Sequence, residues 1–249
     1  MPEIASCLAM TIRTLNYTLT HPVNNMLVTI PNVLNKEDIS VIQDLMATAN
    51  FREGTSSAGS EAKRVKNNHE MFISEVEVQR LNNLVMGKLV QNPDYIAAAF
   101  AARIAAPYYA KYTEGMSYGN HVDDPVMGPP NQRYRSDISI TIFLNEPDAY
   151  EGGELVINTA FGEQKIKLNA GDAVLYPSSS THRVAEVTSG ERLVAVTWLQ
   201  STVRDPAKRE ILYNLSKARE VMIKTTPESK ELELMSNSYV NLLRMWSDI

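Results

Sequence analysis

The hydrophobic pattern of this chain changes its period twice, and this change restricts the fold more than any other feature. Between about Arg103 and Leu199, apolar residues alternate with others, as in the run from Ile138 to Leu144. Before and after this region, apolar residues recur every three or four positions, which is typical of helices. Short strands that end at Gly, Pro or Asn-rich turns favour a sandwich or barrel over βαβ units. We therefore expect a mainly β core with flanking helices.

The same pattern divides the 249 residues into four segments of one globular unit. Residues 1–25 are expected to be an N-terminal extension, and residues 26–102 a mostly helical support region. Residues 103–201 form the expected β core, and residues 202–249 the C-terminal helices. In the support region, helices are expected to begin at three N-cap signals: Asn35, the capping-box pattern Ser74 to Glu77, and Asn92 before Pro93.

Composition excludes several classes of protein. With 24 basic and 29 acidic side chains and a net charge of −5, the chain has no overall field for phosphate backbones, so no nucleic-acid partner is expected. Its longest apolar stretch, residues 96–109, is interrupted by Arg103 and is too short to span a membrane. The single cysteine, Cys7, allows neither an internal disulfide nor a cysteine-based zinc site. We expect a soluble, cytoplasmic protein without a membrane partner.

A His-x-Asp pair, His121 and Asp123, is the first candidate for chemistry. On an extended strand or at its end, residues two apart point to the same side. An imidazole, a carboxylate and a second imidazole form the facial triad of non-haem iron(II) oxygenases, which leaves coordination positions open. His182, after the predicted strand that ends at Tyr176, is the natural third ligand. Taken singly, the pair and His182 are equally consistent with surface roles.

Arg192 strengthens this interpretation, because it lies ten residues beyond His182 at the start of the next apolar strand. A guanidinium that points into a barrel needs an anion, and a dicarboxylate cosubstrate would supply one through a bidentate pair. By itself, Arg192 is as well explained as a strand-end arginine that reaches solvent or Glu191. The combination of the His-x-Asp pair, the distal histidine and this arginine is a strong signal.

At this point the sequence resembles the PKHD-type hydroxylases, iron(II)/2-oxoglutarate-dependent dioxygenases related to prolyl 4-hydroxylases. The resemblance extends from about residue 26 to residue 218. The stretches that carry it are residues 111–123, 142–145 with 151–155, 171–182 and 192–201 in the β region, and residues 26–39, 54–68 and 203–210 outside it.

The resemblance implies a double-stranded β-helix, a cupin-like jelly-roll barrel packed against the N- and C-terminal helices, with residues 103–201 as the dioxygenase barrel. It implies that His121, Asp123 and His182 bind catalytic Fe(II), and that Arg192 binds the distal carboxylate of 2-oxoglutarate. Tyr112 falls at a cosubstrate position of the family, and Tyr118 and Trp198 fall at substrate positions.

One residue departs from the family pattern. Where some prolyl hydroxylases have a second tyrosine near the distal carboxylate, this chain has Phe143. Arg192 would then need another partner, and Thr141 is a candidate. A neighbouring pair, Gly152-Gly153, is interpreted as a hairpin or a close approach of backbone, because no helix follows that would make it a phosphate-binding loop.

The expected reaction is hydroxylation of an unactivated C–H bond by Fe(II), 2-oxoglutarate and O₂, with release of succinate and CO₂ and with L-ascorbate as reductant. A peptidyl proline or a similar side chain is the leading substrate. Two alternatives remain open: the same chemistry on a free amino acid or siderophore-like molecule, and a non-enzymatic, cupin-like binding jelly roll. The C-terminal helices could pack on the barrel or form a homodimer.

Overall fold

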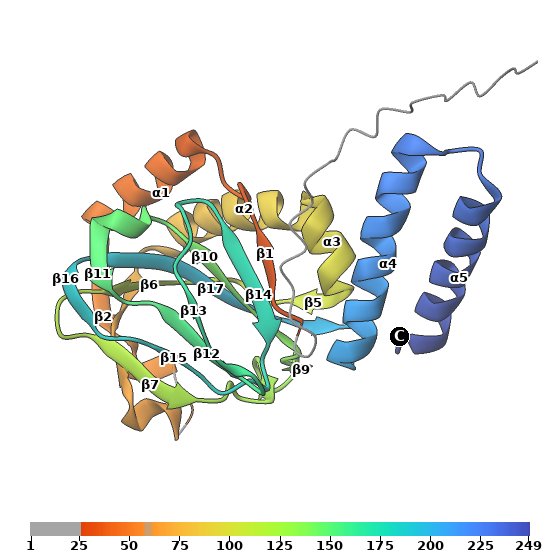
Figure 1. Ribbon diagram of the computed structural model, residues 1–249. Helices are drawn as coiled ribbons and strands as arrows, with labels where there is room; N and C mark the ends of the chain where they lie inside the picture. The colour runs from red at the N-terminus through yellow and green to blue at the C-terminus, as the bar shows by residue number, and fades with distance from the viewer. Residues whose placement is uncertain (1–25, 58, 60) are drawn as a thin grey trace, which may run out of the picture.

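The computed structural model describes residues 26–57, 59 and 61–249, so the predicted N-terminal extension lies outside the described residues. The protein's largest sheet is antiparallel and has the strand order β1-β14-β10-β17-β6-β4-β2, and β5 pairs with one end of β17 (Figure 1). These strands are β1 (Val28–Ile30), β2 (Asn50–Glu53), β4 (His69–Phe72), β5 (Ala101–Ile104), β6 (Tyr108–Tyr112), β10 (Ile138–Phe143), β14 (Ala173–Pro177) and β17 (Arg192–Ser201).

A second antiparallel sheet, called the small sheet to distinguish it from the first, large sheet, has the order β13-β12-β15-β7-β3. Its strands are β3 (Lys66–Asn67), β7 (Ser117–His121), β12 (Leu155–Thr159), β13 (Gly162–Ile166) and β15 (His182–Val184). Two short ribbons complete the β structure: β8 (Val126–Met127) with β9 (Tyr134–Arg135), and β11 (Tyr150–Gly152) with β16 (Val187–Gly190). Short 3₁₀ helices span Gly54–Ser57, Ala62–Arg64 and Pro147–Ala149.

Strand β10 is buried along its whole length, and its two faces serve different purposes. Ile138, Ile140 and Ile142 belong to the core that the large sheet forms with the helices, whereas Phe143 belongs to a second core between the two sheets. Because side chains alternate along a strand, Ser139 and Thr141 lie on the same face as Phe143. The polar residues of this alternating pattern therefore face the interior between the sheets and not solvent.

Three helices cover the outer face of the large sheet: α1 (Lys36–Thr48), α2 (Glu75–Gln91) and α3 (Pro93–Ala99) (Figure 1). The predicted N-caps are confirmed. Asn35 and Ser74 each form a capping box, and the Asn92 side chain accepts hydrogen bonds from the first turn of α3. These caps satisfy backbone N–H groups that the helix itself leaves unpaired.

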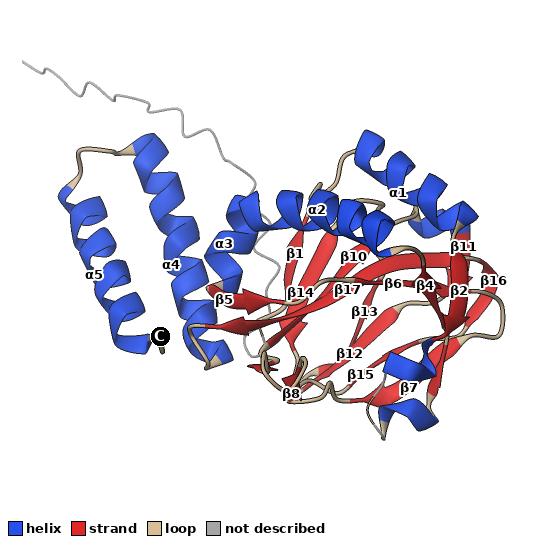
Figure 2. Cartoon of the chain, turned by 180° about the vertical axis from the view of Figure 1, so that it is seen from behind, coloured by secondary structure: helices blue, strands red, loops and turns tan. Residues whose placement is uncertain are grey.

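The chain ends in an antiparallel pair, α4 (Pro206–Thr225) and α5 (Lys230–Trp246), at one end of the sheets (Figure 2). Helix α4 packs against α3, and α5 packs against α4. Within α5 only Leu232 is buried, so most of this helix is in contact with solvent. The homodimer through these helices stays a prediction. In the described part of the chain, no helix combines the length and the apolar character that crossing a bilayer requires.

Candidate metal centre and cosubstrate pocket

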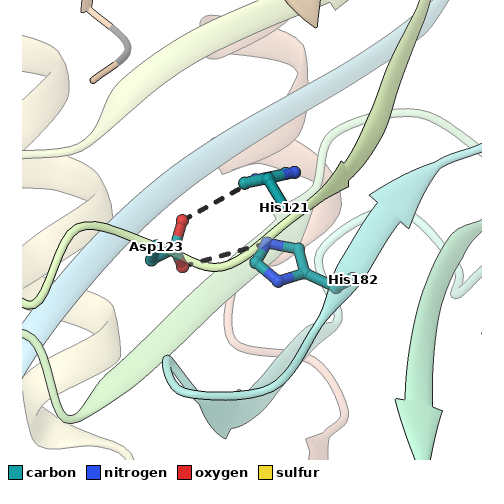
Figure 3. Close-up of side chains that lie close together, drawn as sticks. All are labelled: His121, Asp123 and His182. Carbon is teal, nitrogen blue, oxygen red and sulfur yellow. Dashed lines mark ion pairs between the residues drawn. The ribbon is translucent and has the colours of Figure 1, made fainter. Parts of the chain in front are cut away.

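The three predicted metal ligands come together where two strands of the small sheet meet. His121 is the last residue of β7, His182 is the first residue of β15, and the two are direct partners across the strand pair. Asp123 follows two residues after β7 and lies between them (Figure 3). Its Oδ1 is 3.8 Å from His121 Nε2, and its Oδ2 is 3.8 Å from His182 Nε2. The three side chains thus form one compact group that could hold a metal ion.

Hydrogen bonds fix the orientation of both imidazole rings. His121 Nδ1 is 2.8 Å from the carbonyl oxygen of Gly119, and His182 Nδ1 is 3.0 Å from that of Ser180. Each ring therefore donates from Nδ1 and presents the lone pair of Nε2 to the centre of the group. Burial is the main cause that lowers the pKa of His121 to about 4, and the neighbouring His182 is the second cause. The ring is therefore neutral at physiological pH, which is the form that binds metals.

The donor set fits iron(II). Two neutral imidazoles and one carboxylate are the ligands of the facial triad of non-haem iron oxygenases, and this triad leaves positions open for cosubstrates. All three side chains line a cavity of about 1190 Å³ between the sheets. The lining also includes the other predicted site residues: Tyr112, Tyr118, Arg192 and Trp198.

Arg192 is the first residue of β17 and is only 1% exposed. Its guanidinium carbon lies 5.0 Å from the ring centre of Tyr112 and 5.7 Å from that of Phe143. Arg192 does not reach solvent, and Glu191, its other alternative partner, pairs with Lys111. Among the described residues, Arg192 Nε has no hydrogen-bond partner. A buried guanidinium with an unsatisfied N–H group is costly, so this end of the cavity is suited to an anionic group.

Tyr150 of β11 is the neighbour of Arg192 that the sequence did not reveal. Its side chain is 3% exposed, and its hydroxyl lies within hydrogen-bonding reach of Arg192. Burial raises the pKa of Tyr150, and the positive charge of the neighbouring Arg192 opposes that rise. Thr141, the expected partner of Arg192, is hydrogen-bonded to Tyr176 instead. Tyr150 thus supplies a hydroxyl beside Arg192 where Phe143 cannot.

The Gly152-Gly153 pair lets the backbone pass close to this arginine. Both residues have positive φ, and a Cβ on Gly152 would lie 2.0 Å from the carbonyl oxygen of Glu186. A Cβ on Gly153 would lie 3.0 Å from the Tyr150 ring and 3.1 Å from Arg192 Cδ. The predicted close approach of backbone is confirmed, and its result is to leave room for Tyr150 and Arg192 side by side.

Aromatic side chains also line the wall of the cavity. The Tyr118 ring stacks on His121 with 3.7 Å between ring centres, and Trp198 packs edge-on against Tyr108 at 5.9 Å. A buried ion pair, Lys66 with Glu70 at 2.6 Å, also lines this space. The sequence alone gives no sign of this pair, because only the pairing of β3 with β7 and of β4 with β6 brings the segment near the site.

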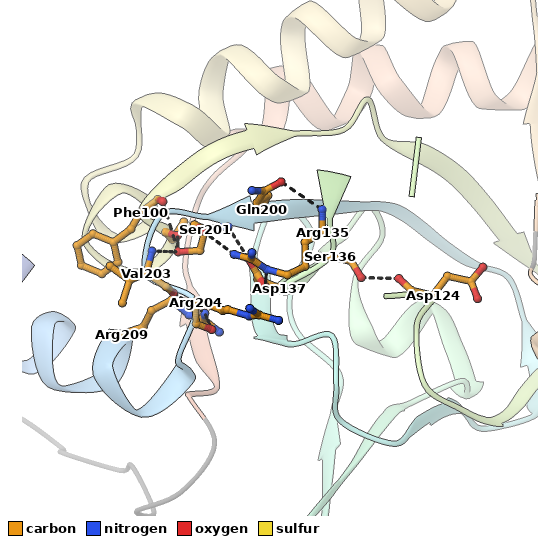
Figure 4. A network of polar contacts seen from close by, with 11 residues as sticks. Phe100, Asp124, Arg135, Ser136, Asp137, Gln200, Ser201, Val203, Arg204 and Arg209 are labelled. Atoms are coloured by element: carbon orange, nitrogen blue, oxygen red, sulfur yellow. Dashed lines mark hydrogen bonds and ion pairs between the residues drawn. The ribbon is translucent and has the colours of Figure 1, made fainter. Parts of the chain in front are cut away.

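A polar network connects the segment after Asp123 to helix α4 (Figure 4). Ser136 Oγ donates to the carbonyl oxygen of Asp124 at 2.5 Å. Next along the chain, the Asp137 carboxylate accepts from Arg135 Nε at 2.6 Å and from the backbone N–H of Ser201 at 2.9 Å. The metal-ligand loop and the end of β17 are therefore held by the same few side chains.

Arg209 of α4 continues this network and is 1% exposed. Its Nη1 donates to the carbonyl oxygens of Val203 at 2.8 Å and Arg204 at 2.9 Å. Burial lowers the pKa of Arg209 to about 10, so it remains charged at physiological pH. Its charge and its hydrogen bonds hold the turn between β17 and α4.

Arg209→Ala is expected to lower the free energy of unfolding by about 3 kcal/mol, because the carbonyl groups of Val203 and Arg204 lose their donor and a cavity remains. Urea unfolding followed by circular dichroism measures the difference. Arg204→Ala, a matched change of an exposed side chain on the same turn, is expected to stay within about 0.5 kcal/mol. Equal stability of the two variants would show that Arg209 does not anchor α4.

A two-sheet jelly roll with a buried His-Asp-His group, and with a buried arginine in the same cavity, defines the class of non-haem iron(II)/2-oxoglutarate oxygenases. The comparisons agree. The model of the 2OG-Fe(II) oxygenase superfamily matches residues 107–200. A PKHD-type hydroxylase from Thioalkalivibrio sulfidiphilus is 49% identical and covers 90% of this chain and 100% of its own. A PKHD-type hydroxylase from Acaryochloris marina is 44% identical with the same coverage.

Solved structures support the fold. A 2OG-Fe(II) oxygenase family oxidoreductase from Burkholderia pseudomallei is similar with a TM-score of 0.54 and 15% identity, over 72% of this chain and 85% of its own. A prolyl hydroxylase from Trichoplax adhaerens, in complex with a peptide fragment of hypoxia inducible factor, has a TM-score of 0.52 and 18% identity, over 76% and 86%.

The chain belongs to the PKHD-type hydroxylase family and is a 2-oxoglutarate-dependent dioxygenase. The predicted family and fold class are confirmed, and so is the enzyme over the non-enzymatic jelly roll. The family implies Fe(II), 2-oxoglutarate and O₂.

Proposed function

We propose that the protein hydroxylates an unactivated C–H bond of a peptidyl proline or a similar side chain. One oxygen atom of O₂ enters the substrate, and the other enters succinate as 2-oxoglutarate loses CO₂. The observation that carries this proposal is the presence, in one cavity, of three side chains suited to iron and of a buried arginine suited to a carboxylate.

Each residue of the site has a defined task in this proposal. His121, Asp123 and His182 hold Fe(II), which supplies the oxidising chemistry together with 2-oxoglutarate and O₂. Arg192 binds the distal carboxylate of 2-oxoglutarate, and the hydroxyl of Tyr150 donates a second hydrogen bond to it. Tyr112, whose ring lies beside Arg192, forms the adjacent wall of the cosubstrate site.

The aromatic wall of the cavity supports a peptide substrate. Tyr118 and Trp198, together with Tyr108 and Tyr134, present flat apolar faces on which a proline ring can pack. The Trichoplax prolyl hydroxylase, which shares the fold, is seen with a peptide fragment. A free amino acid or siderophore-like molecule is the second candidate, and the polar part of the lining, including Lys66 and Glu70, is compatible with it.

A direct experiment separates these two substrates. Succinate formation from 2-oxoglutarate is measured with a library of proline-containing peptides and with free amino acids, and products are analysed by mass spectrometry. A peptide that gains the mass of one oxygen atom, with stoichiometric succinate, supports the leading proposal. Oxygen gain on free molecules alone would replace the peptide by a metabolite, and absence of any 2-oxoglutarate turnover would overturn the proposed reaction.

L-Ascorbate is the proposed reductant that returns iron to Fe(II) after an unproductive turnover. A cytoplasmic location is proposed with it. The proposed location is consistent with a chain whose single cysteine cannot form an internal disulfide.

Tyr150→Phe is expected to raise the dissociation constant of 2-oxoglutarate about tenfold, because one hydrogen bond to a charged group is lost. Anaerobic titration of the Fe(II)-loaded protein, followed by visible absorption, measures this constant. Tyr95→Phe is the matched control, since Tyr95 is also a buried tyrosine but belongs to the core between the large sheet and the helices. Equal constants for both variants would limit Tyr150 to packing.

A further inference from the structure

Two buried serines hold the carboxylate of the metal centre. Ser139 Oγ is 2.5 Å from Asp123 Oδ2, and the hydroxyls of Ser139 and Ser178 are 2.8 Å apart. Ser139 is 0% exposed and Ser178 is 2% exposed. Neither serine was singled out by the sequence, because neither belongs to a ligand motif.

The direction of these hydrogen bonds follows from the chemistry of the groups. An ionised carboxylate has no proton to donate, so the Ser139 hydroxyl donates to Asp123. That hydroxyl has one proton, and it must therefore accept the proton of Ser178. The result is a directed chain from two buried serines, Ser178 and then Ser139, to Asp123 Oδ2 at the cavity.

The two serines come from a different part of the fold than the metal ligands. Ser139 lies on β10, opposite Tyr176 on one side and Trp198 on the other. Ser178 follows β14, and its backbone N–H donates to the Asp137 carbonyl oxygen at 3.1 Å. Both are fixed by the large sheet, whereas His121 and His182 belong to the small sheet. The hydrogen bond to Asp123 thus joins the two sheets at the metal centre.

We propose that Ser139 is a positioning residue that keeps Asp123 a one-oxygen metal ligand, with Ser178 orienting its hydroxyl; the proposal rests on the proposed iron site. With Oδ2 engaged by Ser139, Asp123 offers Oδ1 to the metal. Three protein atoms then occupy three of the positions of an octahedral ion, and the remaining positions suffice for a chelating 2-oxoglutarate and O₂. A carboxylate that bound through both oxygens would remove one of those positions.

The test uses the full chain with Mn(II) as the probe metal. Water-proton relaxation reports how many exchanging waters Mn(II) retains, and Ser139→Ala is expected to retain one fewer than the wild type. The dissociation constant of 2-oxoglutarate from the Mn(II) protein is expected to rise about ten- to a hundredfold, the usual range for changing an outer partner of a metal ligand. An unchanged water number in Ser139→Ala overturns the proposal.

Control variants separate this role from a general effect on the fold. Ser178→Ala leaves the bond to Asp123 in place and is expected to show a smaller rise in the 2-oxoglutarate constant. Ser189→Ala, a matched change of an exposed serine on β16, is expected to behave as wild type. If Ser139→Ala does not fold, Ser139→Cys replaces it, because a thiol of similar size is a weak donor. A wild-type chain that binds no Mn(II) would instead contradict the proposed iron site itself.

Discussion

His182→Ala is expected to abolish stable Fe(II) binding and all turnover of 2-oxoglutarate. The remaining His121 and Asp123 supply too few ligands to hold the ion. Among the described residues, the group contains no fourth side chain that could replace the lost ligand. His121→Ala is expected to have the same effect, because the two imidazoles are equivalent partners across β7 and β15.

The measurement is an anaerobic titration of the metal-free protein with Fe(II) and then 2-oxoglutarate, followed through the visible metal-to-ligand charge-transfer band. The wild type is expected to saturate at one equivalent, and both variants are expected to show no band. His69→Ala is the control, since His69 lies on β4 and does not line the cavity. A band of wild-type strength in either site variant would rule out the proposed triad.

Arg192→Ala is expected to raise the dissociation constant of 2-oxoglutarate about a hundredfold while leaving Fe(II) affinity unchanged. The loss of a buried, charge-assisted pair with a carboxylate is worth about 3 kcal/mol. The metal ligands come from β7, β15 and the segment after β7, so removing the side chain at the start of β17 leaves them in place.

Two comparisons make this prediction specific. Pyruvate has no distal carboxylate, so its weak binding to the Fe(II) protein is expected to be equal in wild type and Arg192→Ala. Arg183 pairs with Glu163 outside the cavity. Arg183→Ala is therefore expected to bind 2-oxoglutarate as the wild type does. A fall in Fe(II) affinity in Arg192→Ala would assign this arginine to the metal site and not to the cosubstrate.

The His-x-Asp pair and the helix starts were predictable from the sequence because their signals are local. The His-x-Asp spacing places two ligands on one side of a strand end, and the N-caps Asn35 and Ser74 act within their own first turns. The partners of Tyr150 and Ser139 were not predictable in the same way. Tyr150 is 42 positions from Arg192 in the sequence, and Ser139 is 16 positions from Asp123. These contacts form only when β10, β11 and β17 are assembled in the sheets. Contacts that depend on strand register leave no pattern in a single sequence.

Strand β10 has a consequence for how such an enzyme can change over evolution. Its isoleucines form the layer beneath the helices, and its alternate positions, 139, 141 and 143, face the interior between the two sheets. Substitutions at positions 139 and 141 alter the surroundings of the metal and the cosubstrate and leave the isoleucine layer in place. Selection for a new substrate and selection for the core beneath the helices therefore act on different residues of one strand, and Phe143 alone belongs to both the site face and a hydrophobic core.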